Sequence, residues 1–248
     1  MTDLGLIVGS GFGWLDLPVA ERREVATPYG APSGPLLTVD CGGRRVACIA
    51  RHGSPHALAP HEVNYRANVW ALHEHGVRRL VGVNVVGAIE DALEPGELAV
   101  PEQLIDYTWG REGTFGGGGR PVVHADFGAP FDATLRAALH DAIRACGLRA
   151  RGGVYGVTQG PRLETAAEID RLERDGCTMV GMTAMPEAAL ARELGLSYAI
   201  VAVAVNRAAG RERGEPIHAQ IEKHLAAGMR RVRSVLERFI AAADAGAL

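Results

Sequence analysis

Short apolar runs alternate with amphipathic segments along most of the chain. Residues 4–8, 80–83 and 198–205 contain no charged side chain, which is typical of strands that are buried on both faces. Residues 62–75 and 131–146 carry apolar side chains at helical spacing, and a glycine suited to ending a helix follows each of them. Strands that alternate with helices predict an α/β fold with a mixed, mostly parallel central sheet flanked by helices.

Three further segments extend this pattern. Residues 24–50 predict strands separated by glycine and proline turns. Thr165-Ala-Ala-Glu168 is a capping box that predicts the start of a helix running to Arg174, and residues 216–243 predict a long final helix with one apolar face. The chain contains no internal repeat and no linker. We therefore expect residues 1–248 to form a single domain.

Composition argues against several classes of protein. Charged residues make up 22% of the 248 residues and the net charge is −3, so no basic surface predicts a nucleic-acid partner. No segment approaches the roughly 20 apolar residues of a membrane-spanning helix. The first residues show neither a basic region nor a long apolar run, and the four cysteines are far apart. We expect a cytoplasmic protein with reduced thiols, without a secretion signal or a membrane partner.

A glycine-rich loop follows the first apolar run. Gly9-Ser-Gly-Phe-Gly13 could wrap backbone N–H groups around a phosphate, and Ser10 could add its hydroxyl. Its spacing matches neither the G-x-G-x-x-G pattern of dinucleotide-binding proteins nor a Walker loop, and no helical run is expected directly after it. As a dinucleotide motif the loop is therefore a weak signal.

Three histidines lie close together in residues 51–61. His52, His56 and His61 suggest a metal site, but their spacing fits no helical ligand face, and we expect no metal. An anion-binding loop explains Arg51 and His52 better, because arginine offers a planar fork of donors that matches phosphate. A turn with surface charges is a third interpretation.

The segment around Thr183 joins a short apolar run to a predicted helix. The helix is expected over residues 188–194, with Pro186 in its first turn and Glu187 complementing the positive helix end. Thr183 would then lie just ahead of free backbone donors, where an anion can bind. An ordinary joint between a strand and a helix is the alternative interpretation.

Polar groups recur where predicted strands end. In open α/β sheets, ligands bind at the carboxyl ends of the strands. Six such positions are polar: residues 9–13, 51–52, 84–87, 159–164, 182–183 and Asn206. Three of these loops offer donors suited to phosphate, while Glu164 and Asn206 suit the edge of a heterocycle. Phosphate beside a nitrogen heterocycle suggests nucleoside phosphorolysis, and a metal-dependent hydrolase or a nucleotide-binding regulatory protein remain alternatives.

Six segments, in order and spread over nearly the whole chain, resemble the trimeric purine nucleoside phosphorylase and methylthioadenosine phosphorylase family. They are Gly9-Ser-Gly11, Arg51-His52-Gly53, Pro60–Asn68, Glu94-Pro-Gly-Glu97, Gln159-Gly-Pro-Arg162 and Gly181–Ala188. The resemblance implies a homotrimeric enzyme that transfers a pentosyl group from a purine to phosphate. It implies no cofactor, because inorganic phosphate is a co-substrate.

The resemblance also assigns site residues. Phosphate would be held by Ser10, Arg51, His52, Asn84, the Val85 backbone and Thr183. Met182 would lie under the ribose, and the base pocket would be lined by Leu163, Glu164, Asn206 and Ala208. Leu163 replaces the aromatic residue usual there, so stacking on the base would be weaker. The expected catalytic pair is Asn206, which would stabilise the charge on the departing base, and Glu164 on its opposite edge. His124 would approach the sugar end of a neighbouring subunit's site.

Two features bear on the substrate. Glu164 and Asn206 match the pair found in phosphorylases of inosine and guanosine, which predicts a 6-oxopurine base. On the final helix, Ile221 falls where those enzymes place a histidine that bonds the 5′-hydroxyl, so an apolar 5′-methylthio group is expected. A small shift in alignment would bring His218 there instead. The combination predicts that phosphate cleaves methylthioinosine to hypoxanthine and 5-methylthioribose 1-phosphate. Inosine or guanosine, and methylthioadenosine, are the alternative substrates.

Overall fold

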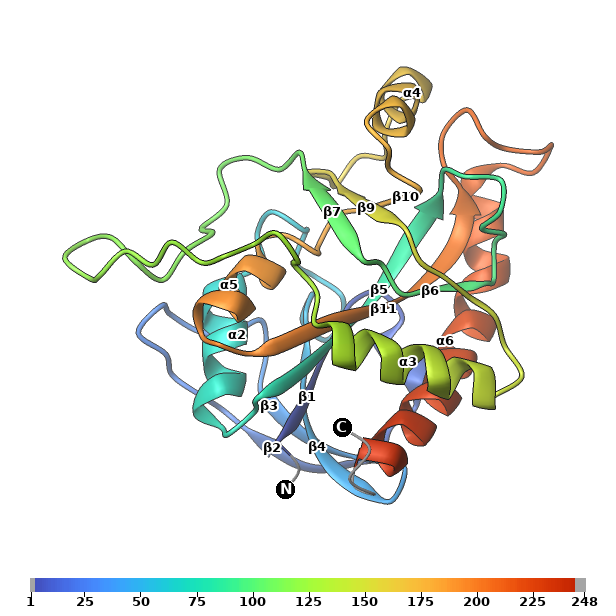
Figure 1. The fold of residues 1–248 in the computed structure, drawn as a ribbon. Coiled ribbons are helices and arrows are strands. Elements are labelled where there is room, and N and C mark those ends of the chain that lie inside the picture. The colour runs from blue at the N-terminus through green and yellow to red at the C-terminus, as the bar shows by residue number, and fades with distance from the viewer. Residues whose placement is uncertain (1–2, 244–248) are drawn as a thin grey trace.

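The computed structural model describes residues 3–243, which form one mixed sheet with helices on both faces (Figure 1). The strands are β1 (Leu4–Val8), β2 (Val19–Arg23), β3 (Leu36–Cys41), β4 (Arg44–Ala50), β5 (Arg79–Ala88), β6 (Leu98–Ala99), β7 (Gln103–Asp106), β8 (Ala150–Arg151), β9 (Val154–Val157), β10 (Met179–Gly181) and β11 (Ser197–Arg207). The helices are α1 (Phe12–Leu15), α2 (Tyr65–Glu74), α3 (Ala133–Ala145), α4 (Ala166–Arg174), α5 (Glu187–Glu193) and α6 (Ile217–Ala242).

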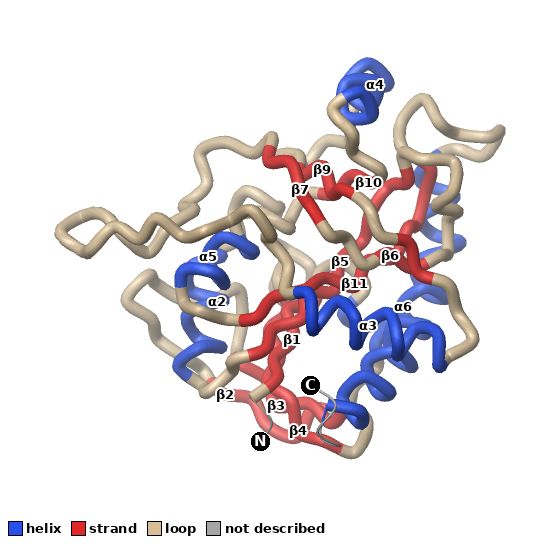
Figure 2. Tube along the Cα trace, in the orientation of Figure 1, coloured by secondary structure: helices blue, strands red, loops and turns tan. Residues whose placement is uncertain are grey.

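The centre of the sheet is parallel. The strand order is β2-β3-β4-β1-β5-β10-β9-β7, and β11 pairs with β5 and connects β6 and β8 to it. β1 is parallel to β4 and β5, and β5 is parallel to β11, whereas β10 runs antiparallel to β5. Figures 1 and 2 show α2 and α5 on one side of these central strands and α3 and α6 on the other. The predicted α/β fold with a mixed, mostly parallel sheet is confirmed.

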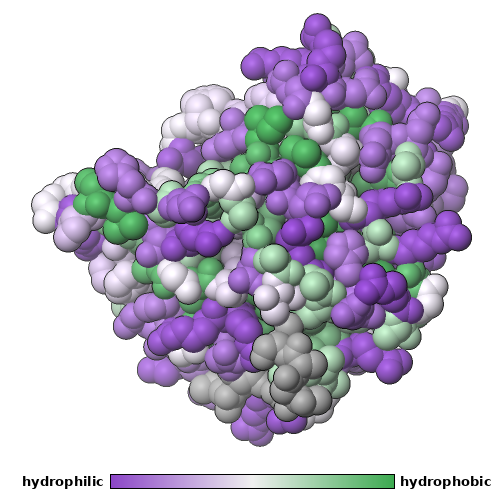
Figure 3. Space-filling view, in the orientation of Figure 1, coloured by the Kyte–Doolittle hydropathy of each residue, from purple (hydrophilic) through white to green (hydrophobic). Residues whose placement is uncertain are grey.

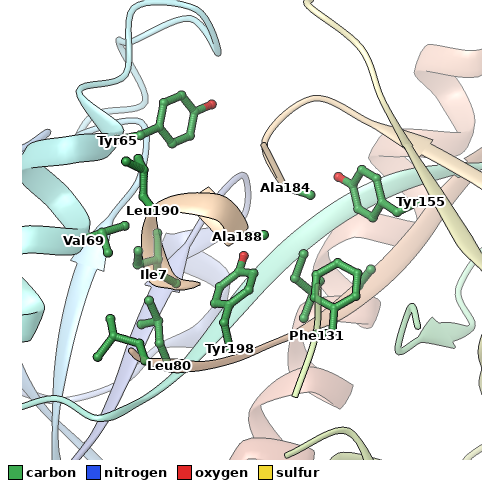
Figure 4. Packing of buried hydrophobic residues seen from close by; sticks show 14 of the residues in the cluster. Ile7, Tyr65, Val69, Leu80, Phe131, Tyr155, Ala184, Ala188, Leu190 and Tyr198 are labelled. Atoms are coloured by element: carbon green, nitrogen blue, oxygen red, sulfur yellow. The ribbon is translucent and has the colours of Figure 1, made fainter. Parts of the chain in front are cut away.

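Side chains of the central strands alternate between two apolar layers. Leu6 and Val8 of β1 pack in the layer that contains α3 and α6. Ile7 packs in the other layer with Val69 of α2 and Leu190 of α5, and Figure 4 shows these residues close together. Because both faces are covered, every position of such a strand is apolar, and the central strands read as continuous runs in the sequence.

β5 and β11 extend further than their apolar runs predict. Asn84 and Gly87, expected in a loop, lie inside β5, where Asn84 pairs with Ala202 and Gly87 with Asn206 of β11. Both asparagines are buried. The strands continue through these polar residues because their side chains find hydrogen-bond partners inside the protein, which a pattern of apolar residues cannot indicate.

The other differences between the predicted and the observed elements are the starts of two helices and one exposed strand. α2 begins at Tyr65, not at residue 62, because the Asn64 side chain accepts a hydrogen bond from the Ala67 N–H (3.1 Å) and caps the helix. α1 directly follows the glycine loop, where the pattern predicts no helix. β2 is not predicted because all of its residues are exposed and lack an apolar alternation. The capping box at Thr165 and the long final helix are confirmed.

The described surface is mostly hydrophilic on the face seen in Figure 3. The long segment between β7 and α3 extends away from the sheet in Figure 1 and contains neither helix nor strand, apart from an isolated bridge between Gly117 and Arg120. Among residues 3–243, no helix is long and apolar enough to span a membrane.

Candidate active site

A cavity of about 480 Å³ opens where the central parallel strands end. The loops after β1 and β4 reach it, as do the last residues of β5 and β11. Most of the residues that the sequence assigns to the site line it: Ser10, Arg51, His52, Val85, Leu163, Glu164, Met182, Thr183, Asn206, Ala208 and Ile221. The fold thus gathers segments from the whole length of the chain at one edge of the sheet.

Arg51 lies at this cavity in a buried ion pair. Its Nε and Nη2 donate to the two carboxylate oxygens of Glu187 (2.7 and 2.8 Å), and neither side chain is exposed. Glu187 also accepts a hydrogen bond from the Tyr198 hydroxyl (2.7 Å). Burial acts to lower the pKa of Arg51, but the carboxylate raises it on balance, so the guanidinium stays charged.

This pair gives Glu187 a role that the sequence does not predict. The residue does begin α5, but its carboxylate is bound by Arg51 and Tyr198 and has no exposed surface. Glu187 is also the acidic residue in the first turn of α5, as expected. The only signal in the sequence is an acidic residue at the start of an otherwise apolar helix.

Asn84 lies behind the cavity wall and fixes the direction of the hydrogen bonds there. Its Oδ1 accepts from Arg51 Nη2 (3.1 Å), because a guanidinium can only donate. Its Nδ2 therefore faces Thr183, whose Oγ1 accepts (3.1 Å). The hydroxyl proton of Thr183 is left to donate into the cavity, which suits an anion. Asn84 itself does not line the cavity, so it acts on the site through Thr183.

His52 presents an acceptor to the cavity. Its Nδ1 lies 2.8 Å from the Leu58 carbonyl oxygen, and because a carbonyl only accepts, Nδ1 carries the proton. Burial and the neighbouring Arg51 charge lower the pKa of His52 to about 4. The ring is therefore neutral near pH 7, with Nε2 unprotonated. A phosphate that still carries a proton can donate to this nitrogen.

Of the other two histidines in residues 51–61, His56 lines the cavity and His61 does not. The His56 ring stacks on His52 with centroids 4.3 Å apart, and its Nε2 lies 3.1 Å from Ser10 Oγ. His61 is exposed and does not line the cavity. Within residues 3–243, no three His, Cys, Asp or Glu side chains are grouped as metal ligands would be.

Another part of the wall combines a carboxylate with an amide. Glu164 Oε1 accepts a hydrogen bond from the Thr158 hydroxyl (2.5 Å). Asn206 is 7% exposed, and its Nδ2 donates to the Arg207 carbonyl (2.7 Å). Each side chain is thus fixed by a hydrogen bond to a neighbouring residue, and both line the cavity. A carboxylate and an amide placed in this way suit the polar edges of a heterocycle.

One face of α6 completes the wall with apolar side chains. Ile217, Ile221 and Leu225 recur every four residues and all line the cavity. His218 is exposed and lies outside the lining. The packing of α6 therefore turns Ile221, and not His218, towards the cavity, which decides between the two positions that the sequence leaves open. The sequence does not single out Ile217 and Leu225, although their four-residue spacing from Ile221 is a signal for them.

His124 lies apart from these residues. It is exposed, on the segment between β7 and α3, and does not line the cavity of its own chain. Its predicted contact is with the site of a neighbouring subunit, so that role stays a prediction.

Known proteins resemble this chain over nearly its whole length. A family model described as "Phosphorylase superfamily" matches residues 3–241. The chain is 49% identical to the probable S-methyl-5′-thioinosine phosphorylase of Pseudomonas syringae pv. tomato, over 98% of this chain and 100% of that protein. It is 55% identical to a probable S-methyl-5′-thioinosine phosphorylase of Xylella fastidiosa, over 84% of this chain and 85% of that one.

The fold agrees with solved structures as well. Methylthioadenosine phosphorylase from Schistosoma mansoni in complex with adenine matches with a TM-score of 0.92 and 32% sequence identity, over 99% of this chain and 93% of that chain. Sequence and fold therefore lead to the same assignment, which the resemblance of the six segments predicts. This chain belongs to the phosphorylase superfamily and is an enzyme of the nucleoside phosphorylase family.

Proposed function

We propose that this enzyme cleaves S-methyl-5′-thioinosine with inorganic phosphate to give hypoxanthine and 5-methylthioribose 1-phosphate. The observation that carries the proposal is one cavity in which Glu164 and Asn206 share the wall with the apolar face of α6. Relatives about half identical to this chain, named probable S-methyl-5′-thioinosine phosphorylases, support it.

Glu164 selects the base in this proposal. A carboxylate accepts a hydrogen bond from the N1–H of a 6-oxopurine, whereas N1 of adenine is itself an acceptor. A buried mismatch of this kind costs about 1–3 kcal/mol. Hypoxanthine is therefore favoured over adenine as the leaving base, while Leu163, which is 37% exposed, contributes less stacking than an aromatic ring.

The face of α6 selects the 5′ substituent. Ile217, Ile221 and Leu225 offer no hydrogen-bonding group from their side chains, so a 5′-hydroxyl would lose its contacts with water and gain none. A methylthio group instead buries apolar surface there. We expect this contact to favour the 5′-methylthio substrate over the 5′-hydroxyl substrate by about 1–3 kcal/mol, or roughly 10–200-fold in specificity.

The reaction needs no covalent group from the protein. The electron pair of the glycosidic C–N bond moves to the purine as a phosphate oxygen forms a bond to the anomeric carbon. Ser10, Arg51, His52 and Thr183 hold the phosphate beside the sugar, which lowers the entropic cost of the encounter. Asn206 donates to the departing base and stabilises its negative charge, and Met182 lies under the ribose.

A comparison of three nucleosides tests the proposal. Release of free base should depend on phosphate, and kcat/KM should be highest for methylthioinosine over inosine and methylthioadenosine. Replacing Ile221 with His should lower the preference for methylthioinosine over inosine, whereas His218→Ala, at an exposed position, serves as the matched control and should leave it unchanged. A parent enzyme that prefers inosine is a purine nucleoside phosphorylase, and comparable turnover of methylthioadenosine would remove the proposed role of Glu164. Base release without phosphate, sensitive to chelators, would point to a hydrolase.

The assembly belongs to the same proposal. A homotrimer in the cytoplasm would place His124 of one subunit near the sugar end of the next site. Sedimentation should then show a trimer, and His124→Ala should raise KM for the nucleoside without altering the trimer. A stable, fully active monomer would refute this part.

A further inference from the structure

Arg111 connects two loops that border the cavity. It lies on the segment between β7 and α3, and its Nη1 donates to the carbonyl oxygens of Met182 and Met185 (2.7 Å each). Its Nη2 donates to the carbonyl of Gln159 (2.8 Å), and its Nε to the side-chain oxygen of the same residue (3.3 Å). One guanidinium therefore holds the loop after β10 and the loop after β9 in a fixed relation.

The surroundings of this guanidinium differ from those of Arg51. Its hydrogen-bond partners within residues 3–243 are backbone carbonyls, the Gln159 amide and the Tyr65 hydroxyl, and none of them is a carboxylate. The guanidinium also lies over the Tyr65 ring, 5.5 Å from its centroid. A half-buried cation is costly unless dipoles surround it, and here the carbonyl oxygens of the two loops supply them.

These contacts set the orientation of peptide groups next to the site. Met182 and Thr183 line the cavity, and the loop after β9 leads to Leu163 and Glu164. A carbonyl oxygen carries partial negative charge, so a peptide that turned its oxygen into the cavity would repel phosphate. Arg111 binds the carbonyl of Met182 and keeps that oxygen directed at itself.

We propose that Arg111 is a positioning residue of this enzyme. It holds the loop after β10, which carries Met182 and Thr183, at a fixed distance from the loop after β9, which leads to Glu164. It does not line the cavity and acts through Met182 and Gln159. The inference rests on the proposed phosphorolysis, because its readout is the binding of phosphate and the cleavage of the nucleoside.

Three variants test it. Arg111→Ala removes all of these bonds, and Arg111→Lys keeps the charge but replaces the planar fork of donors with a single ammonium group. Arg192→Ala is the matched control. Arg192 also donates to a backbone carbonyl, that of Ala129 on the segment between β7 and α3, but it does not line the cavity.

In Arg111→Ala, kcat/KM should fall about 100-fold, the order expected when reacting groups are misplaced by about 1 Å. KM for phosphate should rise about tenfold, and Arg111→Lys should lie between Arg111→Ala and the wild type. Arg192→Ala should stay within about twofold of the wild type. A smaller folded fraction lowers the apparent kcat but leaves KM unchanged, so the rise in KM for phosphate separates positioning from stability.

The inference is overturned if Arg111→Ala, or Arg111→Lys where the alanine variant does not fold, retains the wild-type KM for phosphate and a kcat/KM within threefold of the Arg192→Ala control. If the wild type cleaves no nucleoside with phosphate, the proposed function fails independently. Calorimetric titration with inorganic phosphate then decides on Arg111: weaker binding in Arg111→Ala than in Arg192→Ala supports it, and equal binding refutes it.

Discussion

Replacing Glu187 with Gln probes the buried ion pair on which the cavity is built. In the wild type, both oxygens of Glu187 accept hydrogen bonds from Arg51, and neither side chain is exposed. Gln keeps the shape but has no negative charge, and its amide NH₂ would face a guanidinium that can only donate. The Arg51 cation would then lie buried without its counter-charge.

The expected cost follows from this geometry. Breaking a buried ion pair by removing one partner costs about 3–5 kcal/mol. The remaining carbonyl of Gln can still accept one bond from Arg51 or Tyr198, so we expect the lower end, about 3 kcal/mol in the free energy of unfolding. Because a bound phosphate would supply the missing negative charge, phosphate should stabilise Glu187→Gln more than it stabilises the wild type.

Urea unfolding with and without phosphate measures both effects. Glu193→Gln is the matched control: it lies on the same helix, and its side chain accepts a hydrogen bond from the Phe115 N–H (2.8 Å) that Gln can also accept. If Glu187→Gln unfolds at the same urea concentration as Glu193→Gln, the ion pair does not carry the stability assigned to it. If phosphate stabilises Glu187→Gln no more than the wild type, Arg51 does not face the phosphate.

Three further outcomes are expected. Asn206→Asp combined with Ala208→Asp should shift the kcat/KM ratio from methylthioinosine towards methylthioadenosine, and an unchanged ratio would contradict the assigned base pocket. Between about pH 6.5 and pH 4, unfolded His52 binds a proton that folded His52 does not, so the ligand-free enzyme should lose stability as the pH falls through this window, and His52→Asn should flatten that loss in pH-dependent urea unfolding. In Gly181→Ala, the added Cβ would overlap the Tyr155 hydroxyl, so thermal unfolding should occur at clearly lower temperature, whereas Gly34→Ala, with nothing within 4 Å, should unfold like the wild type.

The sequence by itself determined the alternation of strands and helices and most of the residues that line the cavity. Apolar runs such as residues 4–8 and 198–205 identify strands because both faces of the sheet are covered, and the capping box at Thr165 identifies a helix because its hydrogen bonds are local. The glycine loop and Arg51 follow strands directly, so the rule that ligands bind at the carboxyl ends of parallel strands brings them together without further information.

Only the tertiary structure decided which groups are partners. Glu187 lies 136 positions from Arg51, and no local pattern links them, because such a pair forms only when α5 packs against α2 and β11 and Glu187 thereby reaches Arg51 at the end of β4. Arg111 likewise contacts its loops through backbone carbonyls, which every residue possesses. The orientation of α6 was also undecided, since Ile221 and His218 are nearly one turn apart on the same helix. Packing of α6 against β11 turned Ile221 inward, because burying the apolar face against the sheet stabilises the fold and leaves the imidazole in water.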